Sequence, residues 1–199
     1  MSIIKIIYNK LIYRPYIKKK LKYGGHKFRL GFDSKIHHPE FISIGENFYS
    51  GPKTYMGTNK YNPINIGEDV MFGSECMIIG GNHNTIYTKN HMIYNQEADQ
   101  NGQEIVIEKG VWVGTRSMII SGAVIGEGSV IGAMSLVNTY IPPYCIAVGI
   151  PAKAIRPRFK DYRELKVLLS NVKSKLTISE INKIYEKYSL PTYQGKEIR

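Results

Sequence analysis

An aliphatic residue returns every six positions in the second half of this chain, and this period limits the fold more than any other feature. The aliphatic positions are Val113, Ile119, Ile125, Ile131 and Val137, and a small residue follows four positions after each of the first four, at Ser117, Ala123, Ser129 and Ser135. An α-helix repeats every 3.6 residues and a two-sided strand every two residues, so neither produces a period of six. The pattern therefore predicts a repeat architecture.

The same hexad occurs earlier in the chain, as Ile44-Gly45, Ile66-Gly67 and Phe72-Gly73. We interpret each hexad as one short straight side of a coil, with one inward aliphatic side chain and with a small residue or glycine where the backbone turns. Three hexads make a three-sided coil, and stacked coils bury a continuous aliphatic column through parallel strand pairing. The sequence therefore predicts an all-β solenoid over residues 36–158, with about five coils.

The repeat is interrupted once, by the polar segment 80–104, and it is flanked by two segments that do not follow the period. A polar stretch of this length inside a compact solenoid is typical of a functional loop. Residues 1–35 form a basic, Ile-rich N-terminal segment, for which we expect an amphipathic helix that either covers the open end of the solenoid or docks on a membrane surface. Residues 159–199 are expected to form a C-terminal helical extension, helical over 160–188, that caps the solenoid or packs in a trimer.

The net charge of +11 is unevenly distributed. Residues 1–35 contain ten Lys and Arg against one Asp, residues 36–150 contain five against ten Asp and Glu, and residues 151–199 contain twelve against five. Because the central body is acidic, the chain lacks the continuous basic face of a nucleic-acid-binding protein. Lysines interrupt the apolar N-terminus, so no membrane span is expected. We expect a cytoplasmic protein, with the inner face of the membrane as a further place of action.

The two cysteines, Cys76 and Cys145, form neither a metal motif nor a disulfide framework, and we interpret them as buried thiols.

The segment Val111–Arg158 resembles the coenzyme-A-binding half of hexapeptide-repeat acetyltransferases. The resemblance rests on three motifs, which are VWVGT at 111–115, IGAMSLV at 131–137 and GIPAKAIR at 149–156, and it covers about residues 40–160. Within that family the chain is most similar to maltose, galactoside and capsular or lipopolysaccharide sugar O-acetyltransferases. The resemblance implies a left-handed parallel β-helix, acetyl-CoA as co-substrate without a metal, and a homotrimer with sites between adjacent chains.

His83, at the start of the inserted loop, matches the family's catalytic histidine. The resemblance assigns it as the general base that removes a proton from an acceptor hydroxyl during attack on the thioester. The backbone N–H of Thr115 is assigned as the donor that stabilises the oxyanion. The group that orients the second imidazole nitrogen, whether a carboxylate or a carbonyl, is not identified by the sequence.

The resemblance also implies a coenzyme A site and an acceptor site. The cofactor-binding residues are Trp112, Thr115, Ala133, Asn138, Thr139, Lys153 and Arg156, and the loop residues that would bind acceptor are Asn82, Asn84 and His91. Plainer interpretations are packing at a subunit contact for Trp112 and a solvated basic face for Lys153 and Arg156. Residues 48–59 lack the acceptor-binding side chains of the small-sugar enzymes, so acceptor residues there are not assigned.

The sequence thus predicts an acyltransferase that O-acetylates a sugar or cell-surface polysaccharide precursor. The alternatives are an amino sugar, serine or xenobiotic acceptor, and a β-helix scaffold without catalytic activity. A zinc enzyme of carbonic-anhydrase type is disfavoured because the repeats carry no histidine triplet.

Overall fold

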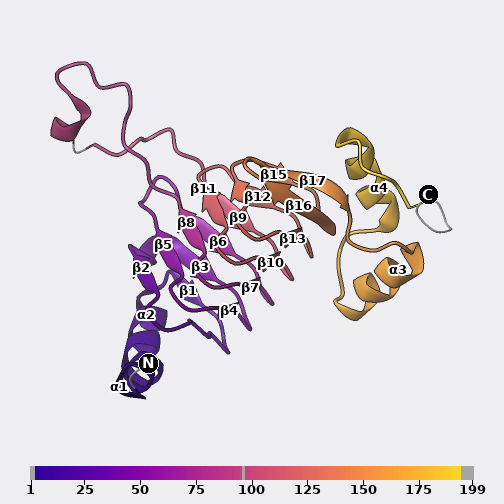
Figure 1. The fold of residues 1–199 in the computed structure, drawn as a ribbon, viewed down its shortest axis with the longest axis horizontal. Helices are drawn as coiled ribbons and strands as arrows, with labels where there is room; N and C mark the ends of the chain where they lie inside the picture. Colours follow the sequence, from indigo (N-terminus) through magenta and orange to yellow (C-terminus); the bar gives the residue numbers. More distant parts are fainter. Residues whose placement is uncertain (1–2, 96, 194–199) are drawn as a thin grey trace.

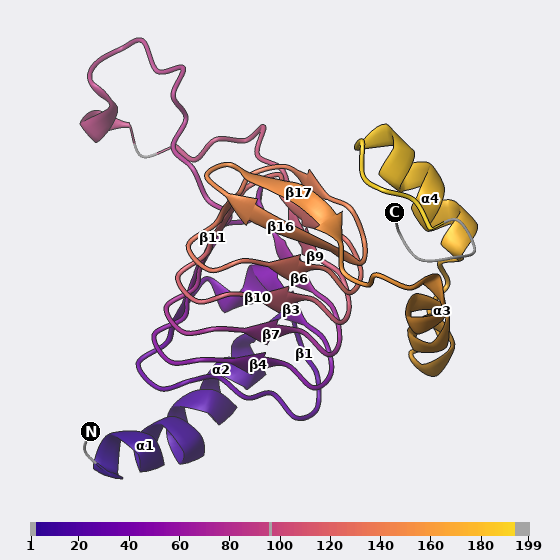
Figure 2. The same cartoon turned by 45° about the vertical axis from the view of Figure 1, so that its right-hand side comes forward.

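The computed structural model describes residues 3–95 and 97–193 and consists of a stack of coils with helices at both ends (Figure 1). The chain passes through three sheets in turn, and strands of successive coils pair in parallel within each sheet. Figure 2 shows the coils one above another. The predicted parallel repeat architecture is confirmed, and it starts earlier in the chain than expected.

The three sheets form the sides of the stack, and we name them sheets A, B and C. Sheet A contains β1 (Tyr23–Gly24), β3 (Ile42–Ile44), β6 (Ile64–Ile66), β9 (Ile105–Ile107), β12 (Val124–Ile125) and β15 (Tyr140–Ile141). Sheet B contains β4 (Tyr49–Ser50), β7 (Met71–Phe72), β10 (Trp112–Val113), β13 (Val130–Ile131), β16 (Cys145–Gly149) and β17 (Ala152–Pro157), of which only β17 pairs antiparallel. Sheet C contains β2 (Lys35–His37), β5 (Tyr55–Gly57), β8 (Met77–Ile79), β11 (Met118–Ile120) and β14 (Leu136–Val137).

The aliphatic positions of the hexads point inward and fill the stack. All five residues of the predicted series are 0% exposed, namely Val113, Ile119, Ile125, Ile131 and Val137. The small residues between them are buried too, and hydroxyls among them bond the next coil, as when Ser117 Oγ donates to the Gly132 carbonyl at 2.9 Å. Cys76 and Cys145 are free and buried, as predicted, and burial raises the pKa of their thiols to about 11 and about 12.

Glycine serves this stack mainly by allowing close approach between coils. A Cβ on Gly114 would lie 2.6 Å from the Ala133 nitrogen, and one on Gly45 would lie 2.6 Å from the Glu68 nitrogen. Several left-handed turn positions instead carry side chains, for example Arg116 at φ 60°. The sequence-based expectation that glycine marks the sharp turns is therefore incomplete, because glycines that directly follow an inward aliphatic residue, such as Gly45 and Gly114, are required by the neighbouring coil.

The first coil begins within residues 1–35, the basic amphipathic segment that the sequence placed before the solenoid. After α1 (Ile3–Tyr8), the π-helix η1 (Asn9–Tyr13) and α2 (Arg14–Lys20), strand β1 already pairs with β3. Phe28 and Leu30 are buried and fill this coil. Their spacing departs from the hexad, which explains why the boundary at residue 36 appeared in the sequence. Residues 1 and 2 of the predicted segment lie outside the described residues.

The C-terminal extension forms two helices, α3 (Tyr162–Asn171) and α4 (Ile178–Lys187), where the sequence indicated one helical stretch. The chain breaks the helix at Lys173, which has a left-handed φ of 49°, and Thr177 then starts α4 with a capping box to Glu180. The predicted extension runs to residue 199, of which 194–199 lie outside the described part of the chain.

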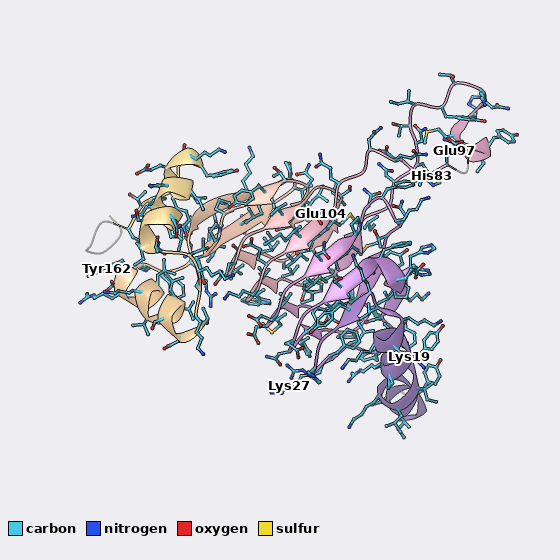
Figure 3. All side chains as sticks on the ribbon, turned by 180° about the vertical axis from the view of Figure 1, so that it is seen from behind. Lys19, Lys27, His83, Glu97, Glu104 and Tyr162 are labelled. Atoms are coloured by element: carbon cyan, nitrogen blue, oxygen red, sulfur yellow. The ribbon has the colours of Figure 1, made fainter. Side chains whose placement is uncertain are left out.

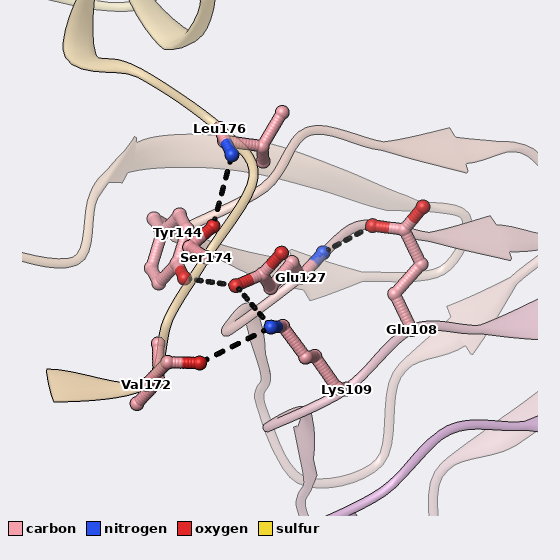
Figure 4. A network of polar contacts seen from close by, with 7 residues as sticks. All are labelled: Glu108, Lys109, Glu127, Tyr144, Val172, Ser174 and Leu176. Atoms are coloured by element: carbon pink, nitrogen blue, oxygen red, sulfur yellow. Dashed lines mark hydrogen bonds and ion pairs between the residues drawn. The ribbon is translucent and has the colours of Figure 1, made fainter. Parts of the chain in front are cut away.

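Polar contacts attach this helical pair to the last coils (Figure 4). The buried Tyr144 hydroxyl donates to Glu127 Oε1 at 2.5 Å, and Lys109 Nζ donates to the Val172 carbonyl at 3.3 Å while it lies 3.7 Å from Glu127 Oε1. From α4, the Tyr185 hydroxyl lies 2.8 Å from the Tyr144 carbonyl and 3.1 Å from the Pro143 carbonyl. The extension is therefore fixed by buried hydrogen bonds as well as by apolar packing.

Replacing Tyr185 with Phe tests this attachment. Burial raises the pKa of the Tyr185 hydroxyl, so the stability it contributes is fully present below about pH 10, the unfolded value, and is lost as the pH rises above it. We expect Tyr185→Phe to lower the free energy of unfolding by about 1–2 kcal/mol at pH 8. Urea unfolding at pH 8 and at higher pH should show the gap to wild type narrowing above about pH 10. A constant gap would contradict the assignment.

Candidate active site

The interrupting segment 80–104 leaves the stack after β8 and returns at β9, and it extends well away from the coils (Figure 1). Its base is a two-stranded stalk, in which His83 forms an antiparallel bridge with Ala98. The Asn84 N–H donates to the Glu97 carbonyl at 3.2 Å, and the Asp99 N–H donates to the Asn82 carbonyl at 3.0 Å. These bonds hold the stalk in one conformation and thereby position His83.

His83 is exposed and lines an open cavity of about 260 Å³ at the foot of the stalk. The other lining residues are Asn59, Gly81, Asn82 and Ala98. Within residues 3–95 and 97–193 no hydrogen bond involves the imidazole ring of His83. Glu97 lies close by, on the opposite strand of the stalk (Figure 3). The ring is thus accessible, and the orienting partner left open by the sequence is not supplied by the described part of this chain.

Asn59 is a residue that the sequence analysis missed. It belongs to an insertion, Thr58–Asn62, between β5 and β6, and its Oδ1 accepts the N–H groups of Tyr61 and Asn62 at 2.9 and 3.1 Å. A Cβ on Gly81 would lie 3.2 Å from Asn59 Nδ2, so the amide sits directly against the start of the loop. The signal in the sequence was the run of polar residues that breaks the hexad before Ile64.

Asn62 joins this insertion to the far end of the loop. Its side chain is fully buried, and its Nδ2 donates to the Ser121 hydroxyl at 2.8 Å and to the Gln103 carbonyl at 3.3 Å. The Ser121 hydroxyl in turn donates to the same Gln103 carbonyl at 2.8 Å. The Thr58 hydroxyl donates to the Asn62 carbonyl, and Gly80 packs on both residues. Asn62 therefore contacts both ends of the loop, through its side chain where the loop returns and through its carbonyl, beside Thr58, where the loop leaves the coils.

The other loop residues assigned to the acceptor separate into two places. Asn82 lines the His83 cavity, and its Oδ1 accepts the His83 N–H at 3.0 Å. Asn84 Oδ1 instead closes a turn by accepting the Ile86 N–H at 2.9 Å. His91 precedes the short helix η3 (Met92–Tyr94) at the exposed tip and does not line the cavity.

The residues assigned to coenzyme A follow sheet B and its corners. Trp112, Val130, Ile146 and Arg156 are neighbours in register across β10, β13, β16 and β17 and form one row on the outer face. Trp112 is 49% exposed, and Lys153 pairs with Val148 on the same antiparallel ribbon. A row of this kind presents a flat apolar surface that ends in cations.

Thr115 and Ala133 stack at the corner between sheets B and C, where the Met134 N–H donates to the Thr115 carbonyl at 2.9 Å. Among the described residues none accepts a hydrogen bond from the Thr115 N–H, which leaves this donor free. The nearby Arg116 donates to Glu75 Oε2 at 2.8 Å, and this bond holds the pKa of the Glu75 carboxyl below its ordinary value. The corner thus offers a free amide donor beside an ion pair that is already satisfied.

His83 and Thr115 do not share a corner of this chain. The loop starts and ends at the corner between sheets C and A, where Asn138 and Thr139 also lie, whereas Thr115 and Ala133 lie at the corner between sheets B and C. Sheet C separates the two groups. A single chain therefore carries both sets of predicted residues without bringing them together.

Comparisons with known proteins identify the family of this chain. Residues 104–139 match the bacterial transferase hexapeptide (six repeats) family. The galactoside O-acetyltransferase of Escherichia coli is 31% identical over 151 residues, which cover 67% of this chain and 70% of that protein. The chain belongs to the hexapeptide-repeat acetyltransferase family. The predicted family and the enzyme class, an acyltransferase, are confirmed.

Two further similar proteins align with different fractions of this chain. A hexapeptide-repeat acetyltransferase from Vibrio cholerae, solved in complex with acetyl-CoA, aligns with a TM-score of 0.59 at 27% identity over 78% of this chain and 83% of that one. A chloramphenicol acetyltransferase of Klebsiella aerogenes is 44% identical over 73 residues, which span 37% of this chain and only 34% of that protein.

Among the described residues no cluster of His, Cys, Asp or Glu is arranged to hold a metal ion.

Replacing Asn62 with Ala tests whether this side chain fixes the loop. We expect Asn62→Ala to increase hydrogen exchange at the loop base by about tenfold, because the two hydrogen bonds of this buried side chain are lost. Asn65→Ala is the matched control, since the Asn65 amide bonds Glu104 at 2.9 Å on the exposed surface. Hydrogen exchange read by mass spectrometry over residues 80–104 measures both. Equal effects of the two variants would contradict the role of Asn62.

Proposed function

We propose that this chain transfers the acetyl group of acetyl-CoA to a hydroxyl of a sugar or of a capsule or lipopolysaccharide precursor, with His83 as general base. The observation that carries the proposal is the exposed imidazole in an open cavity flanked by the amides of Asn59 and Asn82. Amide side chains both donate and accept hydrogen bonds, which suits the hydroxyls of a sugar. The galactoside O-acetyltransferase relative supports the same acceptor class.

The proposed reaction needs no covalent enzyme intermediate. The neutral His83 imidazole removes the hydroxyl proton as the oxygen attacks the thioester carbonyl. A tetrahedral oxyanion forms, and the free N–H of Thr115 donates to it. The C–S bond then breaks, and the protonated imidazole returns its proton to the sulfur of coenzyme A. The products are the acetyl ester and free coenzyme A.

The cofactor is proposed to lie along the outer row of sheet B and the corner beside it. Trp112 borders the acetyl group and the pantetheine arm, which runs past Ala133, while Lys153 and Arg156 meet the phosphates of the nucleotide. Asn138 and Thr139 lie at the corner between sheets C and A, so they would reach the pantetheine arm from the neighbouring chain. The V. cholerae structure with acetyl-CoA supports this cofactor. The three-sided stack is proposed to be left-handed, as the family resemblance implies.

We propose a homotrimer in which the loop of one chain approaches the corner between sheets B and C of its neighbour. Two observations support it, namely the separation of His83 from Thr115 within one chain and the exposed apolar side chains of the loop. Ile86 and Ile93 are 81% and 84% exposed. Apolar side chains this open are typical of a surface that a partner covers.

The second candidate acceptor is a xenobiotic, which the partial match to a chloramphenicol acetyltransferase favours. Amino sugars and serine are further candidate acceptors. The non-enzymatic alternative is a β-helix scaffold that has no catalytic activity. The proposed place of action is the cytoplasm.

Replacing His83 with Ala is the direct test of the base. Coenzyme A release from acetyl-CoA is measured over a panel of mono-, oligo- and amino sugars, serine and chloramphenicol. We expect His83→Ala to lower acceptor-dependent release by at least about a hundredfold, because a positioned general base contributes that much or more. The active acceptor in the wild-type panel then defines the substrate class.

His91→Ala is the matched control, because His91 belongs to the same loop but lies outside the cavity. Its rate should stay within a few-fold of wild type, whereas equal losses in both variants would remove the distinction between the two histidines. Coenzyme A binding by the purified protein separates a missing acceptor from a scaffold that has no activity.

A mixing experiment tests the shared site. His83→Ala and Ala133→Trp, in which the new side chain blocks the cofactor path, should each be inactive alone. Co-expressed, they should recover about a quarter of wild-type activity, because a quarter of the loop and corner pairs in mixed trimers carry neither change. No recovery would contradict a site built from two chains. A chain with both changes, mixed with wild type, controls for dilution.

A further inference from the structure

The N-terminal helix attaches to the stack along only one of its sides. Helices α1, η1 and α2 run without a break from Ile3 to Lys20. Asn9 and Ile17 are 5% and 3% exposed, and the Tyr13 hydroxyl accepts the Ile36 N–H at 3.3 Å. These residues, four positions apart, form the side that covers the first coil. The N-terminal end of the helix extends past the stack (Figure 2).

The rest of the helix surface is largely apolar and open, and Tyr8 at its edge also borders a cavity with Asp33 and Lys35 of the first coil. Five large apolar side chains on it are half or more exposed, namely Ile7 at 50%, Tyr8 at 53%, Leu11 at 65%, Ile12 at 58% and Tyr16 at 57%. They recur at spacings of three and four residues, so they form a continuous face. A face of this size on one helix is typical of a binding surface, whereas single exposed apolar residues are not.

The charge beside this face points to one kind of partner. Residues 1–32 contain no Asp or Glu, and their Lys and Arg are Lys5, Lys10, Arg14, Lys18, Lys19, Lys20, Lys22, Lys27 and Arg29. Lys10 and Lys18 follow the helix beside the apolar face, and Lys20 Nζ lies 5.9 Å from the centre of the Tyr16 ring. Arg14 lies between Lys10 and Lys18, and its Nε donates to Asn9 Oδ1 at 2.8 Å. Two such helices brought together would place like charges side by side. An anionic surface complements both the charge and the apolar face.

The N-terminal helix lies at one end of the stack, so a surface that binds it would contact only that end of the molecule. It lies at the first-coil end, while the pair α3 and α4 lies at the opposite end (Figure 1). No helix within the described part of the chain is long and apolar enough to span a bilayer. The partner geometry that fits is therefore a helix lying in the plane of the interface.

We propose that the face formed by Ile7, Tyr8, Leu11, Ile12 and Tyr16, with the lysines and arginine beside it, docks the enzyme on an anionic lipid surface. Binding buries the apolar side chains at the boundary between headgroups and acyl chains, and the basic side chains pair with anionic headgroups. The proposal does not depend on the acetyl-transfer activity, because lipid binding is measured without acetyl-CoA.

Vesicle flotation of the full-length protein tests the apolar contribution. Wild type should bind vesicles of phosphatidylcholine with phosphatidylglycerol, and bind vesicles of phosphatidylcholine alone much less. Leu11→Ser/Ile12→Ser should reduce the partition coefficient by at least about tenfold. The matched control, Ile155→Ser/Val167→Ser, removes apolar side chains that are 54% and 60% exposed elsewhere on the molecule and should bind as wild type does. Circular dichroism and thermal unfolding of both variants check that they fold as wild type does.

The charge contribution is tested by Lys19→Gln/Lys20→Gln. Each lysine near an anionic surface contributes about fivefold in partitioning at low salt, so we expect about a twenty-fivefold loss that disappears at high salt. Lys183→Gln/Lys187→Gln in α4 is the control, and the pairs match because Lys20 and Lys187 both lie over tyrosine rings, at 5.9 and 6.0 Å.

Three outcomes would overturn the proposal. Wild type could fail to bind anionic vesicles, or could bind neutral and anionic vesicles equally. Alternatively, Leu11→Ser/Ile12→Ser could keep its vesicle binding and change the mass of the protein in solution by light scattering, which would assign the face to contacts between copies of this chain.

Discussion

Close backbone contact between successive coils is the constraint on which the rest of this structure depends. Glycines that follow inward aliphatic residues let the next coil approach, as Gly67 does where a Cβ would lie 2.7 Å from the Lys109 nitrogen. At that spacing the parallel hydrogen bonds form and the aliphatic side chains of successive coils pack into one buried column. Every outward position is then fixed in register with the coil before and after it. The row of sheet B and the free amide at Thr115 inherit their positions from this contact.

The sequence predicted those parts of the molecule that repeat. Val113 through Val137 occupy the core because their period leaves no other arrangement that buries them together. The first coil escaped prediction because Phe28 and Leu30 fill it with larger side chains at an irregular spacing. The break between α3 and α4 depends on one residue, Lys173, in a left-handed conformation that propensity alone does not indicate.

Only those residues of the candidate site that belong to a recognisable motif could be predicted from the sequence. His83 was assigned by resemblance, and the cavity around it agrees with an accessible imidazole. Asn59 and Asn62 carry no motif, and their roles follow from an insertion that the fold brings beneath the loop. Asn62 Oδ1 is also buried without a hydrogen-bond partner among the described residues. The amide at this position is therefore explained by the hydrogen bonds of its Nδ2 to Gln103 and Ser121 at the end of the loop. Side chains of this kind become visible only when segments distant in sequence are placed together.

The coil stack also sets a length. The N-terminal helix lies at the coil of β2, and the loop leaves after β8, two strands further along sheet C. Neighbouring strands are about 4.8 Å apart, so the loop leaves the stack about 10 Å along its axis from the end that the helix covers. Insertion of one coil would lengthen this distance by about 5 Å without altering a residue of the helix or of the loop. The number of coils between them thus sets the distance along the stack axis from the N-terminal helix to the loop that carries His83, in steps of one coil.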